Sequence, residues 1–155
     1  MTHTLRIVSG GQTGVDRAAL DAALESGIEI GGWCPAGRWA EDGPIPMHYP
    51  LWETASSDPA ERTHLNVRDS HATLILTLGP PRGGTALTFE LAMSMGRPHR
   101  LVYLGDPPSA SRLAEWIHQL DMRVLNVAGP RESEAPGIYE RAFELVADLL
   151  RALNQ

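Results

Sequence analysis

The apolar residues of this chain form short continuous runs that are separated by stretches of helical spacing. Runs rich in Leu, Ile and Val are typical of strands covered on both faces of a parallel sheet. The clearest is Ala72-Thr73-Leu74-Ile75-Leu76-Thr77-Leu78, which has the pattern of a central strand. We predict five strands, at residues 5–8, 28–30, 72–78, 101–104 and 124–127.

Helical patterns lie between these strands. Asp58-Pro59-Ala60-Glu61 is a typical helix start, with a capping aspartate and a proline at the first helical position. We predict helices over residues 15–26, 58–70 and 86–95, around 113–120, and after residue 137. The alternation predicts a three-layer α/β domain with a mainly parallel sheet of five strands, or slightly more, and helices on both faces.

Residues 31–50 differ from the rest because Gly and Pro interrupt every periodic pattern. An irregular segment of this length in a small domain is usually a functional loop or disordered. Its bulky residues favour order, and they are Trp33, Trp39, Ile45, Tyr49 and Leu51. We therefore interpret the segment as a wall or lid of a site.

A glycine-dense turn, Ser9-Gly10-Gly11-Gln12-Thr13-Gly14-Val15-Asp16-Arg17, joins the first strand to the first helix. Its glycines permit positive φ, so that backbone N–H groups can converge on an oxyanion. Thr13 and Asp16 have the spacing of a capping box at a helix N-terminus, which attracts anions. The turn thus predicts an anion site, and the alternative is a tight turn without a ligand. It matches neither the dinucleotide fingerprint nor the P-loop.

The same pattern of strand, glycine loop, threonine and helix occurs again at Gly79-Pro80-Pro81-Arg82-Gly83-Gly84-Thr85. Here we expect Thr85 to cap a helix from Ala86 to Met95. The sequence therefore predicts two anion sites of one kind.

Ligands of parallel α/β sheets bind where the loops after the strands gather at one edge. The loops that should converge are residues 9–14, 31–46, 79–85 and 128–137. Arg38, Arg82 and Arg131 lie in three of them, and a guanidinium suits phosphate or another tetrahedral oxyanion. The alternative is that these arginines pair with Asp42 or Glu132 at the surface.

Five further side chains have two interpretations each. Asp16 binds a ligand hydroxyl or amine, or it only caps the helix. Glu90 faces either a ligand or solvent. Cys34 is a buried small hydrophobe or a reactive thiolate. Trp33 and Trp39 pack in the protein, or they stack on a planar heterocycle.

Length and charge narrow the functional classes. The 155 residues, 43% of them hydrophobic, suit a single domain over residues 1–155. A net charge of −6 without a long basic run argues against nucleic acid as a partner. One cysteine excludes an internal disulfide, and the six histidines show no metal-ligand spacing. With no signal peptide and no long apolar run, we expect a cytoplasmic protein that does not contact membranes.

Four motifs carry a family resemblance. They are SGGQTGVDRAALD from residue 9, GGWCPAGRWAEDGPIP from residue 31, RGGTALT from residue 82 and LNVAGPRES from residue 125. Over residues 5–150 the chain resembles the molybdenum cofactor carrier family. That family is a circularly permuted, YpsA-like branch of the Rossmann-like group that includes the lysine-decarboxylase-like phosphoribohydrolases.

The resemblance implies a Rossmann-like fold and a carried ligand, either the molybdenum cofactor (molybdopterin) or a related phosphorylated pterin or nucleotide-like molecule. It also implies a homo-oligomer, dimer or tetramer, with molybdoenzymes as possible partners. The predicted ligand-binding residues are Gly10, Gly11, Gln12, Thr13, Gly14, Asp16, Arg38, Asp42, Arg82, Gly83, Gly84, Thr85, Arg131 and Glu132.

One departure favours a carrier over an enzyme. The phosphoribohydrolases have a catalytic glutamate three residues after the threonine of Pro-Gly-Gly-x-Gly-Thr-x-x-Glu, and this chain has Thr88 there. Glu90 lies two residues further, about 200° around the helix, so it cannot simply replace that glutamate. The alternatives are a phosphoribohydrolase-like enzyme, with Glu90 as the catalytic candidate, or a sensor of a nucleotide derivative.

Overall fold

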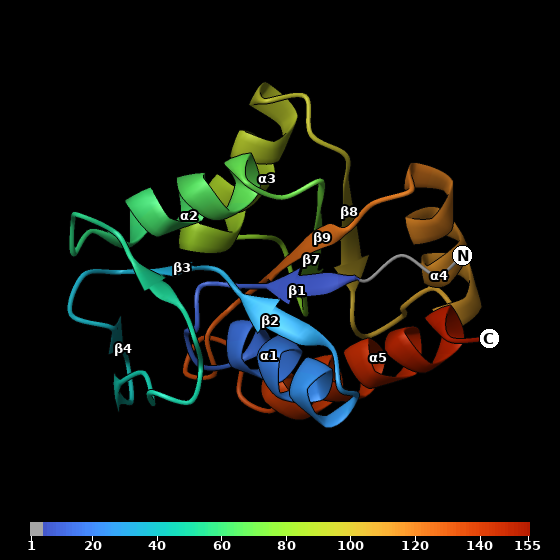
Figure 1. Ribbon diagram of the computed structural model, residues 1–155, viewed down its shortest axis with the longest axis horizontal. Helices are drawn as coiled ribbons and strands as arrows, with labels where there is room; N and C mark the ends of the chain where they lie inside the picture. The colour runs from blue at the N-terminus through green and yellow to red at the C-terminus, as the bar shows by residue number, and fades with distance from the viewer. Residues whose placement is uncertain (1–4) are drawn as a thin grey trace.

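The computed structural model describes residues 5–155, and its central feature is a parallel five-stranded sheet in the order β2-β1-β9-β7-β8 (Figure 1). The strands are β1 (Arg6–Val8), β2 (Glu29–Gly31), β7 (Ala72–Thr77), β8 (His99–Tyr103) and β9 (Val124–Ala128). All four pairings are parallel. The five predicted strands are confirmed, with ends displaced by one or two residues.

Five helices cover the two faces of this sheet. They are α1 (Val15–Glu25), α2 (Pro59–Arg68), α3 (Gly83–Ser94), α4 (Ala110–Leu120) and α5 (Ile138–Leu153). Figure 1 shows α2 and α3 above the sheet and α1 and α5 below it, with α4 beside α5. The predicted three-layer, Rossmann-like architecture is therefore confirmed.

The strand order brings three loops together. The unit β1–α1–β2 runs toward one edge of the sheet and β7–α3–β8 runs toward the other. Right-handed crossovers in opposite directions place α1 and α3 on opposite faces. Because β9 lies between β1 and β7, the loops after β1, β9 and β7 are neighbours at the carboxyl edge, where such folds bind ligands.

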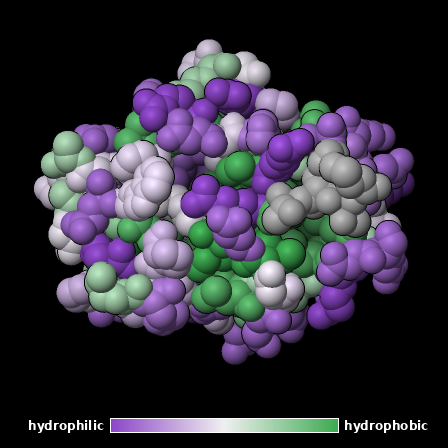
Figure 2. Space-filling model, viewed as in Figure 1, coloured by the Kyte–Doolittle hydropathy of each residue, from purple (hydrophilic) through white to green (hydrophobic). Residues whose placement is uncertain are grey.

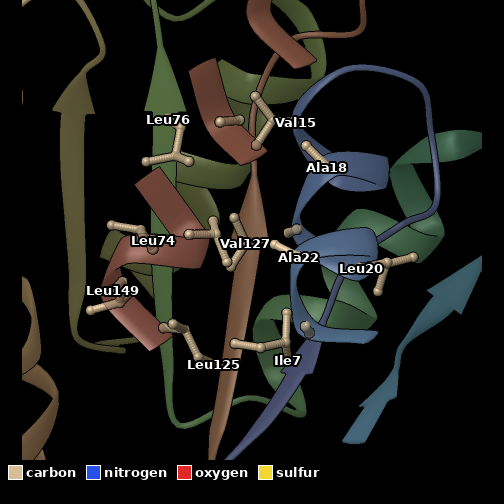
Figure 3. Close-up of a cluster of buried hydrophobic side chains, with 14 of the residues drawn as sticks. Ile7, Val15, Ala18, Leu20, Ala22, Leu74, Leu76, Leu125, Val127 and Leu149 are labelled. Carbon is tan, nitrogen blue, oxygen red and sulfur yellow. The ribbon is translucent and has the colours of Figure 1, made fainter. Parts of the chain in front are cut away.

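The core lies between the sheet and the layer of α1 and α5. In Figure 3, Ile7, Leu125 and Val127 of the strands face α1 and α5, and all three side chains are buried. Ala18 and Ala22 of α1 are buried as well. Small side chains permit close approach of α1 to the sheet and to α5, so this layer of the domain is closely packed.

The surface seen in Figure 2 is mostly polar, with a hydrophobic area over β2, α1 and the nearby end of α5. No helix among residues 5–155 is long and apolar enough to cross a membrane.

The segment after β2 is ordered, as its bulky residues predicted, although it has more regular structure than expected. β3 (Trp33–Cys34) pairs with β6 (Trp52–Glu53), and β4 (Trp39–Ala40) pairs with β5 (Gly43–Pro44). Ile45, Tyr49 and Leu51 are buried, and Cys34 is a buried free thiol. The segment packs as part of the domain.

Candidate functional site

A cavity of about 270 Å³ opens where the loops after β1, β7 and β9 meet one side of α2. This volume is near the lower end of small-molecule sites. Its lining residues are Gly10, Gln12, Asp16, Trp39, Pro59, Arg62, Thr63, Asn66, Gly83, Gly84, Thr85, Thr88, Asn126, Ala128, Gly129, Arg131 and Glu134. Ten of these seventeen residues are polar or charged, and all four predicted loops contribute to the lining, the second of them through Trp39.

Arg62 of α2 lies against the first glycine turn. Its Nη1 donates a hydrogen bond to the carbonyl oxygen of Gly10 at 3.0 Å and lies 3.8 Å from the Asp16 carboxylate. A Cβ at Gly10 would lie 2.2 Å from the same Nη1, so glycine is required for this approach. The guanidinium and the carboxylate both line the cavity and are largely buried.

Asp16 is an ionisable group in an unfavourable place. Burial of its carboxyl raises the pKa from 3.8 to about 6, against the opposing effect of the nearby Arg62 guanidinium and hydrogen bonds from the backbone. A buried acid that faces a cavity with a shifted pKa is typical of functional sites. With this pKa the carboxyl is mostly ionised at pH 7, where it accepts hydrogen bonds, and mostly protonated below pH 6, where it can also donate one.

Thr13 does not cap α1, which corrects the predicted capping box. The N-cap residue is Gly14, and no side chain of the described residues caps this helix. The Thr13 hydroxyl instead donates to Glu41 and accepts from the Glu132 N–H at 3.1 Å. The turn therefore uses its threonine to bind two other loops, and the Asp16 carboxylate is left for the cavity.

The first glycine turn also presents carbonyls rather than amides to its surroundings. The Gly10 and Gly11 carbonyls accept from Arg62 and Arg17, at 3.0 Å each. The Val15 N–H donates to the Pro130 carbonyl. These carbonyl oxygens are acceptors and cannot bind an anion, and the N–H groups of Gly11 and Thr13 donate to the Ser9 and Gln12 side chains instead.

The second glycine turn is arranged differently. α3 begins at Gly83 rather than at Ala86, with Arg82 as N-cap residue and no capping side chain among the described residues. Thr85 is thus in the first turn and is not the predicted cap. Gly83, Gly84 and Thr85 line the cavity. The uncapped N-terminus thus brings backbone N–H groups and positive partial charge to the wall of the cavity.

The third loop contributes Arg131 and Glu134. Arg131 Nε lies 3.4 Å from Glu134 and 3.6 Å from Glu41, yet it makes no hydrogen bond within the described part of the chain. Gly129 brings this loop close to the strands, since a Cβ there would lie 2.2 Å from the Leu76 carbonyl oxygen. Arg131 thus lines the cavity with a guanidinium whose buried Nε lies between two carboxylates.

Several predicted residues lie outside the cavity lining. Arg38 is buried, and its guanidinium donates to four backbone carbonyls, so no donor is directed at a ligand. Asp42 forms a bidentate pair with Arg17. Glu132 accepts from the N–H groups of Gly137 and Tyr139 at the start of α5.

Arg82 and Glu90 are exposed and do not line the cavity either. Three other predicted residues lie outside the lining and hold the first turn in place. Gly11 and Gly14 pack closely against neighbouring segments, and Thr13 forms hydrogen bonds to two other loops. Gly10, Gln12, Asp16, Gly83, Gly84, Thr85 and Arg131 are the predicted residues that the structure brings together around the cavity.

The contribution of α2 to the cavity was not predicted from the sequence. Pro59, Arg62, Thr63 and Asn66 stand at i, i+3, i+4 and i+7, which is one face of a helix. Thr63 and Asn66 are buried, so the polar face points inward. A polar stripe at helical spacing was the signal that could have identified them.

Asn126 was a second missed residue. It is a buried amide in the middle of an apolar strand, and its Nδ2 donates to Thr73 at 3.4 Å. A buried polar side chain costs free energy unless it is hydrogen bonded, so it is unusual inside an apolar strand. An asparagine in such a run was the signal that could have identified this lining residue. Among residues 5–155, no group of three His, Cys, Asp or Glu side chains is arranged to bind a metal ion.

Comparisons with known proteins agree with this architecture. The profile of the "Circularly permutated YpsA SLOG family" matches residues 7–150. A crystal structure from Syntrophus aciditrophicus, named "Putative molybdenum carrier protein", is 40% identical, with a TM-score of 0.88 over 100% of this chain and 98% of that one. No curated protein matches the chain.

Proposed function

Because the chain belongs to the circularly permutated YpsA SLOG family, we propose that it is a binding protein for a small phosphorylated ligand held at this cavity. The proposed ligand is the molybdenum cofactor or a related phosphorylated pterin or nucleotide-like molecule, delivered to molybdoenzymes. The name of the Syntrophus aciditrophicus protein, 40% identical to this chain, supports the proposal.

The uncapped N-terminus of α3 is the observation that carries the proposal. Gly83 and Gly84 line the cavity without a side chain between their amides and the ligand space. Arg62 and Arg131 line the same cavity and add positive charge. Amides at a helix N-terminus together with guanidinium groups are a common arrangement for phosphate.

Isothermal titration calorimetry with guanosine 5′-monophosphate (GMP) and with a phosphorylated pterin tests the proposal. We expect binding of at least one of them, and competition by inorganic phosphate at higher concentration. A Gly84→Val variant places a branched side chain at the helix N-terminus, and it should reduce affinity at least tenfold. Absence of binding by the folded parent protein would exclude the proposed function.

Asp16 favours one second candidate, a phosphoribohydrolase-like enzyme. Its pKa of about 6 suits a general acid or base near neutral pH. The Asp16 side chain lines the cavity, whereas Glu90 lies outside the lining. Thr88 occupies the position of the catalytic glutamate of the phosphoribohydrolases, and its hydroxyl donates a hydrogen bond to the Gly84 carbonyl oxygen. Release of ribose 5-phosphate from GMP, abolished by Asp16→Asn, would establish this activity in place of a carrier role.

We also propose that α3 mediates homo-oligomerisation. Most side chains of this helix are apolar and Glu90 is its one charged residue, but only Thr85, Thr88 and Ala92 of it are buried. Met93 is 54% exposed. Exposed apolar side chains on a helix are often covered by a partner, and a second copy of the chain would cover these. Sedimentation should show dissociation by Met93→Glu and none by Leu24→Glu, a matched change on α1.

A further inference from the structure

Trp39 is the one aromatic side chain among the residues that line the cavity. It begins the β4–β5 hairpin, where it is paired with Pro44, and it is 49% exposed. The other lining residues are mostly polar or glycine. A large apolar ring at the opening of a polar cavity remains in contact with water unless a ligand covers it.

The other tryptophans already have partners. The Trp33 and Trp52 rings pack edge to face at 5.4 Å, and Trp33 Nε1 donates to Asp69 at 3.0 Å. Trp116 lies under the Arg100 guanidinium. Within residues 5–155, the Trp39 ring has neither a hydrogen bond nor a ring partner. The structure therefore distinguishes Trp39 from Trp33, which the sequence could not.

The backbone that carries Trp39 is firmly held. The preceding residue, Arg38, has a φ of 56° and donates to the carbonyl oxygens of Ile45, Pro46, Tyr49 and Leu51. The buried guanidinium thus fixes both ends of the hairpin. This explains the motif arginine without any contact between Arg38 and a ligand.

The far end of the hairpin is held by Glu41 and Asp42. The Glu41 carboxylate accepts hydrogen bonds from Thr13 and Ser133. The backbone N–H of Glu41 donates to the Gln12 side-chain oxygen at 2.9 Å. Asp42 accepts two hydrogen bonds from Arg17. Glu41 therefore joins the hairpin to two loops that form the cavity, and Asp42 joins it to α1. The position of Trp39 is therefore set before a ligand arrives, which lowers the entropic cost of stacking.

We propose that Trp39 stacks on a planar heterocycle and makes the site selective for phosphates that carry a flat heterocycle over simple sugar phosphates. This inference rests on the proposed function, because it assigns the ring end of a ligand whose phosphate lies at α3. Stacking on an aromatic side chain is tolerant of the identity of the ring, so the proposed ligand class is any phosphorylated flat heterocycle.

GMP and ribose 5-phosphate form a matched pair of probes, since they differ by the flat base. The parent protein should bind GMP at least tenfold more tightly, and Trp39→Ala should remove this preference by lowering the affinity for GMP far more than the affinity for ribose 5-phosphate. Trp39→Phe should retain part of the preference. GMP should quench the tryptophan fluorescence of the parent and of the control Trp52→Phe, but much less that of Trp39→Phe.

The outcomes separate this inference from the proposed function. Equal affinities for the two probes in the parent, or a preference that persists in Trp39→Ala, would overturn the stacking role and leave phosphate binding in place. Binding of neither probe by the parent would reject the proposed function and the inference with it. Unchanged urea unfolding of Trp39→Ala would show that the variant is folded, as expected for a half-exposed side chain.

Discussion

The glycine turn after β1, residues 9–14, lies beneath other segments, whereas the turn after β7, residues 79–84, lies at the surface. A Cβ at Gly14 would lie 2.4 Å from the Pro130 carbonyl oxygen, and one at Gly11 would lie 2.6 Å from Leu51. A Cβ at Gly83 or Gly84 would meet no atom within 4 Å. Glycine therefore serves close packing in the first turn, and in the second it leaves open space at the start of α3.

The hydrogen bonds of the two turns differ in the same way. The first turn gives its carbonyls to Arg17 and Arg62, and the N–H of Val15 to Pro130. At the second turn, α3 starts without a capping side chain among the described residues. The first turn therefore positions arginine and aspartate side chains, and the second leaves the N-terminus of α3 without a capping side chain, which is where we propose that the phosphate binds.

The largest expected effect is that of Gly14→Ala in the packed turn. Gly14 has φ 77° and ψ −130°, a conformation that alanine adopts only with strain, and the new methyl group would meet backbone atoms. We expect the free energy of unfolding to fall by about 3 kcal/mol or more. Urea denaturation measures this change, and a loss below about 1 kcal/mol would mean that the turn is not tightly packed.

Asp16→Asn tests the carboxylate that the packed turn places in the cavity. The pKa of Asp16 is raised in the folded protein, so between pH 4 and pH 6 the folded state retains a proton that the unfolded chain has lost. Stability therefore falls as pH rises through this window. The variant avoids that loss and should be more stable than the parent by roughly 2 to 3 kcal/mol at pH 7.5.

The pH dependence is the control for this experiment. The difference between the variant and the parent should disappear at pH 4, where the carboxyl is protonated in the folded protein. A variant that is less stable than the parent at pH 7.5 would show instead that the ion pair of Asp16 with Arg62 outweighs the cost of burial. Thermal unfolding at the two pH values measures the effect.

The sequence predicted the sheet and its layers because strand runs and helical stripes depend on local periodicity. It also predicted which loops converge, since the crossover rule is general. It could not distinguish the two turns. Whether Thr13 caps a helix depends on Glu41 and Glu132, which are distant in sequence, and whether Arg38 is available depends on four carbonyls of the following segment.

Arg131→Ala sharpens the comparison through binding rather than stability. The Arg131 side chain lines the cavity, whereas Arg82 is exposed outside the lining. Loss of a charge-assisted hydrogen bond costs about 1.5 to 3 kcal/mol, so affinity for GMP should fall roughly tenfold to a hundredfold. Arg82→Ala is the matched control and should change affinity much less. Equal losses in the two variants would place the anion further out, between both guanidinium groups.

Gly84→Ala in the open turn should have the smallest effect on stability, and its sign should be opposite to that of Gly14→Ala. Gly84 is the second residue of α3, and a methyl group there has open space around it. Alanine is favoured over glycine in a helix and restricts the unfolded chain, so the free energy of unfolding should rise by about 0.5 to 1 kcal/mol.

The same methyl group enters the cavity lining beside the first amides of α3, so affinity for GMP should fall severalfold in the more stable protein. Urea unfolding and calorimetry on one preparation measure both quantities. A loss of stability would show that the second turn is packed like the first, and unchanged affinity would place the phosphate elsewhere in the cavity.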